Sequence, residues 1–125
     1  MAEPSIPRRR VLVADNSHDL AEVLGEIIRM DERLEFVGYV TTGSEAIAKS
    51  RAGAADVLVL DLGLEDCHGF EVLEKLQSAS SKVRVIVHTG HSSKELEAHA
   101  LRKGAAAYVV KTGDPDALIA AIHGA

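Results

Sequence analysis

The sequence is poor in cysteine and in aromatic residues. Its 125 residues include one cysteine, no tryptophan, two tyrosines and two phenylalanines. A single cysteine excludes an internal disulfide and suits a reducing compartment, so we expect a cytoplasmic protein. Because aromatic side chains are scarce, the core must be built from Val, Leu, Ile and Ala.

Long apolar runs are missing as well. No stretch of about 18 consecutive apolar residues occurs, so we expect no transmembrane helix and no membrane partner. The N-terminus lacks the apolar run of a signal peptide. Residues 1–8 contain two of the three prolines and no hydrophobic periodicity, and we predict a flexible tail there. Residues 9–125 are predicted to form one globular domain.

The chain also has no excess of positive charge. It carries 14 Lys and Arg against 19 Asp and Glu, a formal net charge of −5. This balance argues against direct nucleic acid binding by this chain, because phosphate backbones bind clustered Lys and Arg. The run Arg8-Arg9-Arg10 is a candidate phosphate patch. Three charges make a weak footprint, however, and we interpret the run as a solvated lead-in to a strand.

Five short apolar runs alternate with segments of helical periodicity. Their spacing of roughly 20 to 26 residues is what a right-handed strand–helix–strand crossover needs. The pattern predicts a parallel sheet covered by helices on both faces. One strand, over residues 35–40, contains a glycine and is predicted to lie at an edge. The predicted strands cover residues 11–14, 35–40, 57–60, 83–87 and 105–110, and the predicted helices cover residues 20–28, 45–52, 70–76, 93–104 and 117–122.

The most continuously apolar part of the pattern, Val57 to Leu60, is followed at once by Asp61. Four consecutive apolar residues indicate a strand that is buried on both faces. A carboxylate at the end of such a strand is costly unless it is solvated, paired or used. It also lies where open α/β sheets place their ligands. Asp61 is therefore the first candidate for a functional residue.

Polar side chains follow three more of the predicted strands. Asp15 and Asn16 follow the first strand, Thr89 follows the fourth, and Lys111 follows the fifth. Because the C-terminal ends of parallel strands meet at one edge, we expect these side chains near Asp61. A carboxylate can attack a phosphoryl group to form an aspartyl phosphate, which requires neutralisation of the charge between two anions. Mg²⁺ held by carboxylates, together with the lysine ammonium, can supply that neutralisation.

Four ordered motifs carry a resemblance to a known family. In this order and spacing, the chain resembles the CheY-like receiver domain of bacterial response regulators over residues 9–125. The resemblance implies a flavodoxin-like α/β fold whose five parallel strands have the order 2-1-3-4-5. The motifs are Val-Leu-Val-Ala-Asp ending at Asp15, Asp61 followed eight residues later by Gly69, Thr89 after the fourth strand, and Gly-Ala-Ala-Ala-Tyr-Val-Val-Lys from Gly104 to Lys111.

The resemblance also implies a role for each residue at this edge. Asp61 would accept a phosphoryl group from a histidine kinase or a phosphotransfer protein in a two-component phosphorelay. Lys111 would bind that group, and Thr89 would sense it. Tyr108 matches the aromatic residue that turns inward when the threonine moves. The implied Mg²⁺ ligands are Asp15, Asn16, Asp61 and the backbone carbonyl of Gly63.

The implied output face combines the helix over residues 93–104 with the last strand and the last helix. This face would contact an output protein or effector domain, and it would also join two copies in a homodimer. Residues 111–122 are similar to receivers that precede a LuxR-type helix-turn-helix domain, which makes transcription regulation a candidate output. That domain is not in this sequence. The output partner is then either a separate protein or a C-terminal DNA-binding domain of a longer regulator.

One departure from the family bears on the metal site. The family usually has two acidic residues after the first strand, and the second of them is Asn16 here. An amide oxygen can still coordinate a metal, but one negative charge is lost. We therefore predict weakened Mg²⁺ binding and slow phosphorylation. The alternative function is a pseudo-receiver, an interaction module that works without phosphorylation.

Other kinds of site have weaker support. A hydrolase of the haloacid dehalogenase type also uses a strand-end aspartate, but it requires a second aspartate two residues later, where Gly63 stands. We therefore expect no independent enzyme. His18, His68 and His91 lack the close helical spacing of a strong metal motif and are interpreted as loop histidines. Cys67 is interpreted as a loop cysteine without redox function.

Overall fold

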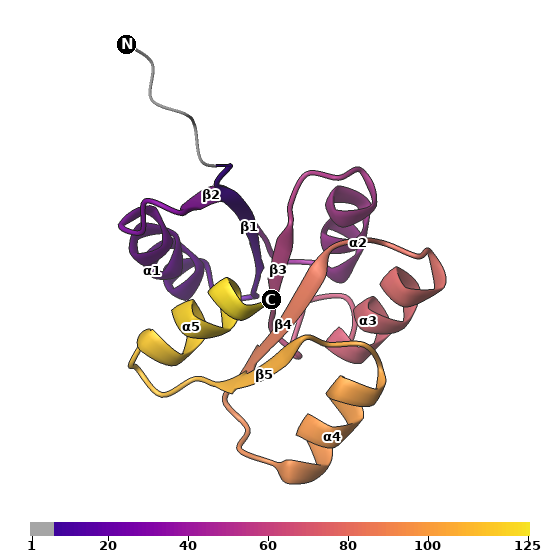
Figure 1. The fold of residues 1–125 in the computed structure, drawn as a ribbon. Helices are drawn as coiled ribbons and strands as arrows, with labels where there is room; N and C mark the ends of the chain where they lie inside the picture. Colours follow the sequence, from indigo (N-terminus) through magenta and orange to yellow (C-terminus); the bar gives the residue numbers. More distant parts are fainter. Residues whose placement is uncertain (1–6) are drawn as a thin grey trace.

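The computed structural model describes residues 7–125, which form a sheet between two layers of helices (Figure 1). Its five parallel strands have the order β2-β1-β3-β4-β5, which confirms the predicted flavodoxin-like fold and strand order. The strands are β1 (Arg9–Ala14), β2 (Leu34–Val40), β3 (Val57–Leu60), β4 (Arg84–Thr89) and β5 (Ala107–Val110), and the helices are α1 (His18–Arg29), α2 (Gly43–Arg51), α3 (Gly69–Ser78), α4 (Lys94–Arg102) and α5 (Asp116–Gly124).

Alternation of side chains along β3 divides the core between the two faces of the sheet. Val57 and Val59 pack with α1 and α5, whereas Leu58 and Leu60 pack with α2, α3 and α4. Figure 1 shows the same division, with α1 and α5 on one side of the sheet and the other helices opposite. Burying one such side chain contributes roughly 1.5–3 kcal/mol. β3 is therefore the most firmly anchored strand, and its end is a rigid place for a functional residue.

The edge position of β2 confirms the expectation from its glycine. Gly38 has a φ of +114°, and the pairing register between β1 and β2 shifts by one residue between Val11 and Val13. This is a β-bulge, for which glycine is well suited because it has no Cβ. The bulge leaves β1 free to continue straight toward its polar end at Asp15.

Five strand limits differ from the prediction. β1 and β2 start earlier than expected, at Arg9 and Leu34, and β4 starts one residue later, at Arg84. β4 continues through His88 and Thr89, because these residues pair with Val109 and Val110 of β5. β5 in turn starts at residue 107, not 105, since Gly104 (φ +101°) and the following residue still complete the end of α4. Backbone pairing between β4 and β5 thus determines where β4 ends and where β5 starts. The polar side chains of His88 and Thr89 do not interrupt this pairing.

Part of the predicted N-terminal tail lies outside the described residues. Of residues 1–8, only Pro7 and Arg8 are described, and they precede β1 without regular structure. Helix α4 has one buried residue, Ala100, which agrees with the poor apolar face expected for it. Within residues 7–125, none of the helices has the length and apolarity needed to cross a membrane.

Candidate functional site

The C-terminal ends of β1, β3 and β5 bring three of the expected side chains together. Lys111 Nζ lies 3.0 Å from Asp15 Oδ2 and 3.5 Å from Asp61 Oδ1. Asp15 is 1% exposed and Asp61 is 9% exposed. The other oxygen of Asp15 accepts a hydrogen bond from the backbone N–H of Ser17, the residue that caps α1. The lysine therefore bridges two buried carboxylates that are far apart in the sequence.

The two carboxylates leave this cluster with one more negative than positive charge. Burial raises the pKa of Asp61 above its usual value, and the neighbouring charge of Asp15 raises it further. The Lys111 ammonium and the backbone N–H of Gly63 oppose that rise in pKa. A cation at this place would relieve the excess charge. The donors are all oxygen atoms, which is the ligand type that Mg²⁺ prefers.

The other two expected metal ligands lie at the solvent side of the cluster. Asn16 and Gly63 are both exposed, as two of the loop residues that follow β1 and β3. A single antiparallel bridge between Gly63 and His68 shapes the second loop. Within residues 7–125, no group of three His, Cys, Asp or Glu side chains is close enough to hold a metal. A metal would thus depend on two carboxylates plus neutral oxygens.

Thr89 and Tyr108 meet at the backbone of one residue, His91. The Thr89 hydroxyl accepts a hydrogen bond from the His91 N–H at 3.2 Å, and the Tyr108 hydroxyl donates to the His91 carbonyl at 2.6 Å. Thr89 is buried, and Tyr108 is half-buried. The Thr89 backbone carbonyl also accepts a hydrogen bond from the Lys111 N–H at 2.7 Å. The residue that joins them, His91, was interpreted from the sequence as a loop histidine only, because nothing local marks a backbone contact.

Close packing explains why a glycine stands eight residues after Asp61. The Gly69 N–H donates to the Leu62 carbonyl at 2.8 Å. A Cβ atom at Gly69 would lie 2.9 Å from the Asp61 carbonyl oxygen and from Leu62 Cα. Backbone atoms cannot swing aside as a flexible side chain can. The start of α3 is therefore in direct contact with the backbone of Asp61.

A second residue of this loop has a structural function that the sequence did not reveal. The Asp66 carboxylate accepts hydrogen bonds from the backbone N–H groups of Gly43 and Ser44, at 2.6 and 3.1 Å, at the start of α2. These bonds lower the pKa of Asp66. Asp66 thereby ties the loop after Asp61 to a different helix. Its partners are more than 20 residues away, so local sequence gives no sign of the contact.

His88 is a further buried polar residue next to the cluster. It is 7% exposed, and its Nδ1 has no hydrogen-bond partner among the described residues. Burial, with a smaller effect of the Lys111 charge, lowers its pKa from 6.5 to about 4. His88 is therefore neutral near pH 7. The strand predicted from the sequence ends at residue 87, one residue before His88, and no function is predicted for His88.

A sequence model of the family described as response regulator receiver domain matches residues 11–123. Two curated relatives are similar over most of the chain. A protein-glutamate methylesterase/protein-glutamine glutaminase from Syntrophomonas wolfei is 33% identical over 108 residues, which are 85% of this chain and 30% of that protein. The nitrate/nitrite response regulator protein NarL of Escherichia coli is 29% identical over 113 residues, 90% of this chain and 52% of that protein. The chain thus spans about half or less of the length of these relatives.

Solved structures match the fold. A two-component response regulator of the LuxR family from Aurantimonas sp. superimposes with a TM-score of 0.87 and 25% identity, covering 94% of this chain and 84% of that chain. Similarity at this level extends over all five strands and helices described above.

We predict that Gly69→Ala destabilises the fold. Its Cβ would meet backbone on both sides, and overpacking of this kind costs about 1–3 kcal/mol. Urea unfolding measures the loss. Gly124→Ala is the matched control, because that helical position has open space, and alanine there should be neutral or stabilising by up to ~1 kcal/mol. Equal stability of the two variants would contradict the packing argument.

We predict that His88 makes the protein less stable in acid. Between pH 6.5 and about 4 the imidazole is protonated in the unfolded chain but not in the folded one, so stability falls as pH falls through this window. His88→Leu should remove about 3 kcal/mol of this loss, as expected for a shift of roughly two pKa units or more. Unfolding free energies measured from pH 7 to 4 test this, with exposed His91→Gln as control. Parallel curves for wild type and His88→Leu would count against it.

Proposed function

The chain belongs to the response regulator receiver domain family, and from this premise we propose that Asp61 accepts a phosphoryl group from the phosphohistidine of a histidine kinase or phosphotransfer protein. The observation that supports this choice is the position of Asp61. Its carboxylate is buried at the end of β3 and lies within 3.5 Å of Lys111 Nζ. Asp15 also contacts Lys111 but is more deeply buried, so Asp61 is the more accessible nucleophile.

The proposed reaction exchanges one bond to phosphorus for another. An oxygen of ionised Asp61 attacks the phosphorus, the P–O bond forms, and the P–N bond to the donor histidine breaks. The donor imidazole leaves with the electron pair. Lys111 is in place to bind the oxygens of the transferred group, since its ammonium already lies between the two carboxylates.

Receiver domains generally bind Mg²⁺ at acidic residues, and the residues of this chain fit that ion. We propose that Asp15, Asn16, Asp61 and the Gly63 carbonyl hold it. When bound, Mg²⁺ supplies charge neutralisation between the carboxylates and the incoming phosphoryl oxygens. Asn16 contributes an oxygen without a charge, so the protein must bind the ion with two carboxylates.

We propose that Thr89, Tyr108 and His91 form the switch. A phosphoryl group on Asp61 would accept a charge-assisted hydrogen bond from the Thr89 hydroxyl. As the Thr89 side chain turns toward that group, its Oγ leaves the His91 N–H. The Tyr108 hydroxyl then leaves the His91 carbonyl as the ring turns inward. Both bonds end on one residue of the loop before α4, so that loop and helix would move together.

The face formed by α4, β5 and α5 is the proposed output surface. Helix α4 is weakly anchored, with one buried residue, and β5 is only half-buried, which suits a surface that rearranges. A partner protein, a C-terminal DNA-binding domain or a second copy of the receiver would bind there. The similarity of residues 111–122 to receivers that precede a LuxR-type helix-turn-helix domain, together with the LuxR-family structure named above, supports a DNA-binding output domain and a role in transcription. Signalling partners of this kind, with the free Cys67, are consistent with the cytoplasm.

We predict that incubation with acetyl phosphate and Mg²⁺ adds a phosphoryl mass to the wild-type protein but not to Asp61→Asn. Intact-mass spectrometry makes the comparison. A mass gain that survives the substitution would exclude Asp61 as the acceptor. No gain on either protein would favour the pseudo-receiver, the second candidate, for which the loss of charge at Asn16 is the supporting observation.

We predict that Asn16→Asp tightens Mg²⁺ binding by at least about tenfold. Two unit charges about 4 Å apart interact by roughly 4 kcal/mol at an effective dielectric constant of about 20, and added repulsion within the empty site offsets part of this gain. Titration with Mg²⁺, followed by amide NMR shifts of Gly63 and Lys111, measures the affinity. Gln77→Glu, which adds the same negative charge at an exposed position in the last turn of α3, is the control for net charge. An unchanged affinity in Asn16→Asp would show that Asn16 does not weaken the site.

A further inference from the structure

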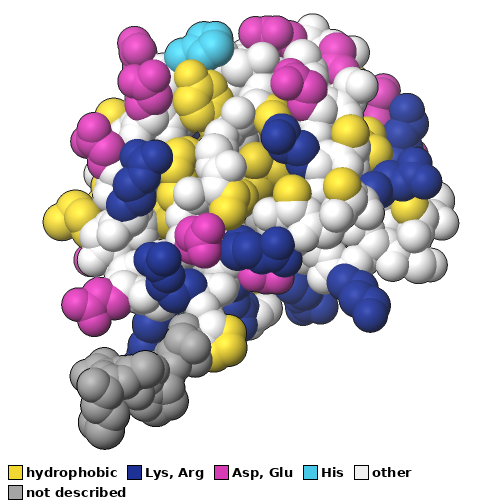
Figure 2. All heavy atoms as spheres, turned by 90° about the horizontal axis from the view of Figure 1, so that it is seen from above, with side chains coloured by type: hydrophobic (Ala, Val, Ile, Leu, Met, Phe, Trp, Pro, Cys, Tyr) yellow, Lys and Arg dark blue, Asp and Glu magenta, His cyan; other side chains and the backbone are white. Residues whose placement is uncertain are grey.

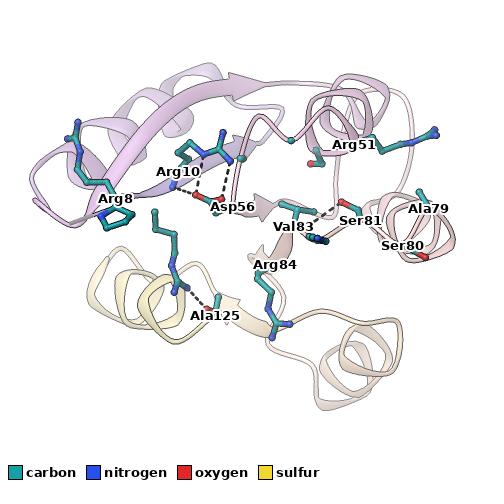
Figure 3. Close-up of a pocket in the computed structure, with 16 residues that line it drawn as sticks. Arg8, Arg10, Arg51, Asp56, Ala79, Ser80, Ser81, Val83, Arg84 and Ala125 are labelled. Carbon is teal, nitrogen blue, oxygen red and sulfur yellow. Dashed lines mark hydrogen bonds and ion pairs between the residues drawn. The ribbon is translucent and has the colours of Figure 1, made fainter. Parts of the chain in front are cut away.

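A second, basic site lies at the N-terminal ends of the strands, on the side of the sheet opposite to the Asp61 cluster. The N-terminal ends of β1 and β4 and the end of α2 surround an open basin of about 840 Å³, drawn in Figure 3. We call it the basal basin. Among residues 7–125, six cationic side chains line it and one side-chain carboxylate, Asp56. The six are Arg8, Arg9, Arg10, Arg51, Lys82 and Arg84.

This concentration of positive charge contrasts with the whole chain, whose net charge is −5. Figure 2 shows Lys and Arg side chains close together at the lower side of the molecule. Like charges held near one another repel, and an anion between them removes that repulsion. The run of arginines at residues 8–10 is thus not a lone patch, because folding adds three more cations from elsewhere in the chain.

Two of these arginines are already engaged. Arg10 forms an ion pair with Asp56, with Nη2 3.1 Å from Oδ1, and Arg9 Nη1 donates to the carbonyl oxygens of Ile122 and Ala125 at the end of α5. Figure 3 shows the contact between Arg10 and Asp56. The remaining four cations form no ion pair with any residue of 7–125. In Figure 3, Arg51 and Arg84 extend outward from the rim, from where their long side chains can turn over the basin.

A buried hydroxyl gives an independent sign of a ligand. Ser50, in the last turn of α2, lines the basin and is 4% exposed. Its Oγ has no hydrogen-bond partner among the described residues. Buried side-chain hydroxyls nearly always have a partner, so this hydroxyl has an unused capacity for a hydrogen bond. The Oγ is closed off from solvent in this rotamer, and a turn about χ1 would bring it to an acceptor oxygen of an anion in the basin.

We propose that the basal basin binds a small anion with several phosphate groups, through the cations of its rim and the Ser50 hydroxyl. The volume is that of a small-molecule site. Arginine side chains bind phosphate oxygens in pairs, which adds geometric selectivity to charge. No aromatic side chain lines the basin, so nucleic acid bases would find no stacking surface there. The site lies at the opposite sheet edge from Asp61 and does not depend on the phosphoryl chemistry proposed there.

The test is a titration of the whole chain with sodium tripolyphosphate, followed by amide NMR shifts. We expect shifts at Gly53, Ser80 and Ser81, which line the basin, and none at Gly63 or Lys111. Shifts confined to Gly63 and Lys111 would place the anion at the other edge and overturn the proposal. So would tighter binding at the basin of a glutamate-rich peptide or a DNA duplex than of tripolyphosphate.

Substitutions distinguish a specific binding site from nonspecific attraction of the anion to positive charge. Arg51→Gln with Arg84→Gln should weaken binding by about tenfold or more, and Ser50→Ala should weaken it several-fold without a change in net charge. Lys94→Gln with Arg102→Gln, two exposed cations of α4, removes the same charge away from the basin and should leave the affinity within about twofold. Equal weakening by the two double variants, or no effect of Ser50→Ala, would show that no specific site exists.

Discussion

The contact of one ammonium with two buried carboxylates is the interaction on which the phosphoryl site depends. Lys111 lies between Asp15 and Asp61, and neither aspartate could be buried so deeply beside the other without it. Close carboxylates repel, and desolvation adds to the cost of keeping both charged. The pKa of Asp61 is raised chiefly by burial, because the Lys111 ammonium does not fully offset the desolvation of this carboxylate. A site with leftover negative charge is suited to a cation, and with that cation to an incoming phosphoryl group.

Rigid backbone holds this cluster in place, and the loop that is proposed to move lies before α4. Asp61 follows the most buried strand, and Gly69 packs directly against its backbone. Asp66 fixes the intervening loop to the start of α2. By contrast, the loop before α4 depends on hydrogen bonds to the backbone of His91, one from Tyr108 and one to Thr89. A signalling receiver requires both a rigid part that holds the reacting side chains and a weakly anchored part that can move.

The two edges of the sheet differ in charge. Carboxylates gather where the strands end, and arginines gather where the strands begin, in the basal basin. An acidic chain can therefore offer a strongly basic surface, which net charge alone does not reveal. Arg9 links that surface to the end of α5, part of the proposed output face. An anion in the basin would consequently lie close to the helix through which the receiver is expected to communicate.

The fold, and the end of the sheet at which the candidate site residues lie, could be predicted from the sequence. Hydrophobic periodicity separates strands from helices, and parallel strands all end on the same side of the sheet. The polar residues Asp15, Asp61 and Lys111 directly follow apolar runs, and Thr89 follows one after a single intervening residue. These signals are local. They could be seen without knowing which strands are neighbours.

Only the tertiary structure decided which of these groups touch and which other residues take part. The burial of His88, the His91 backbone as the shared partner of Thr89 and Tyr108, and the addition of distant cations to Arg8-Arg9-Arg10 all come from pairing between remote segments. The physical reason is that contact distance, desolvation and hydrogen-bond partners are properties of packed neighbours. A residue's own sequence surroundings do not contain them when those neighbours are tens of residues away.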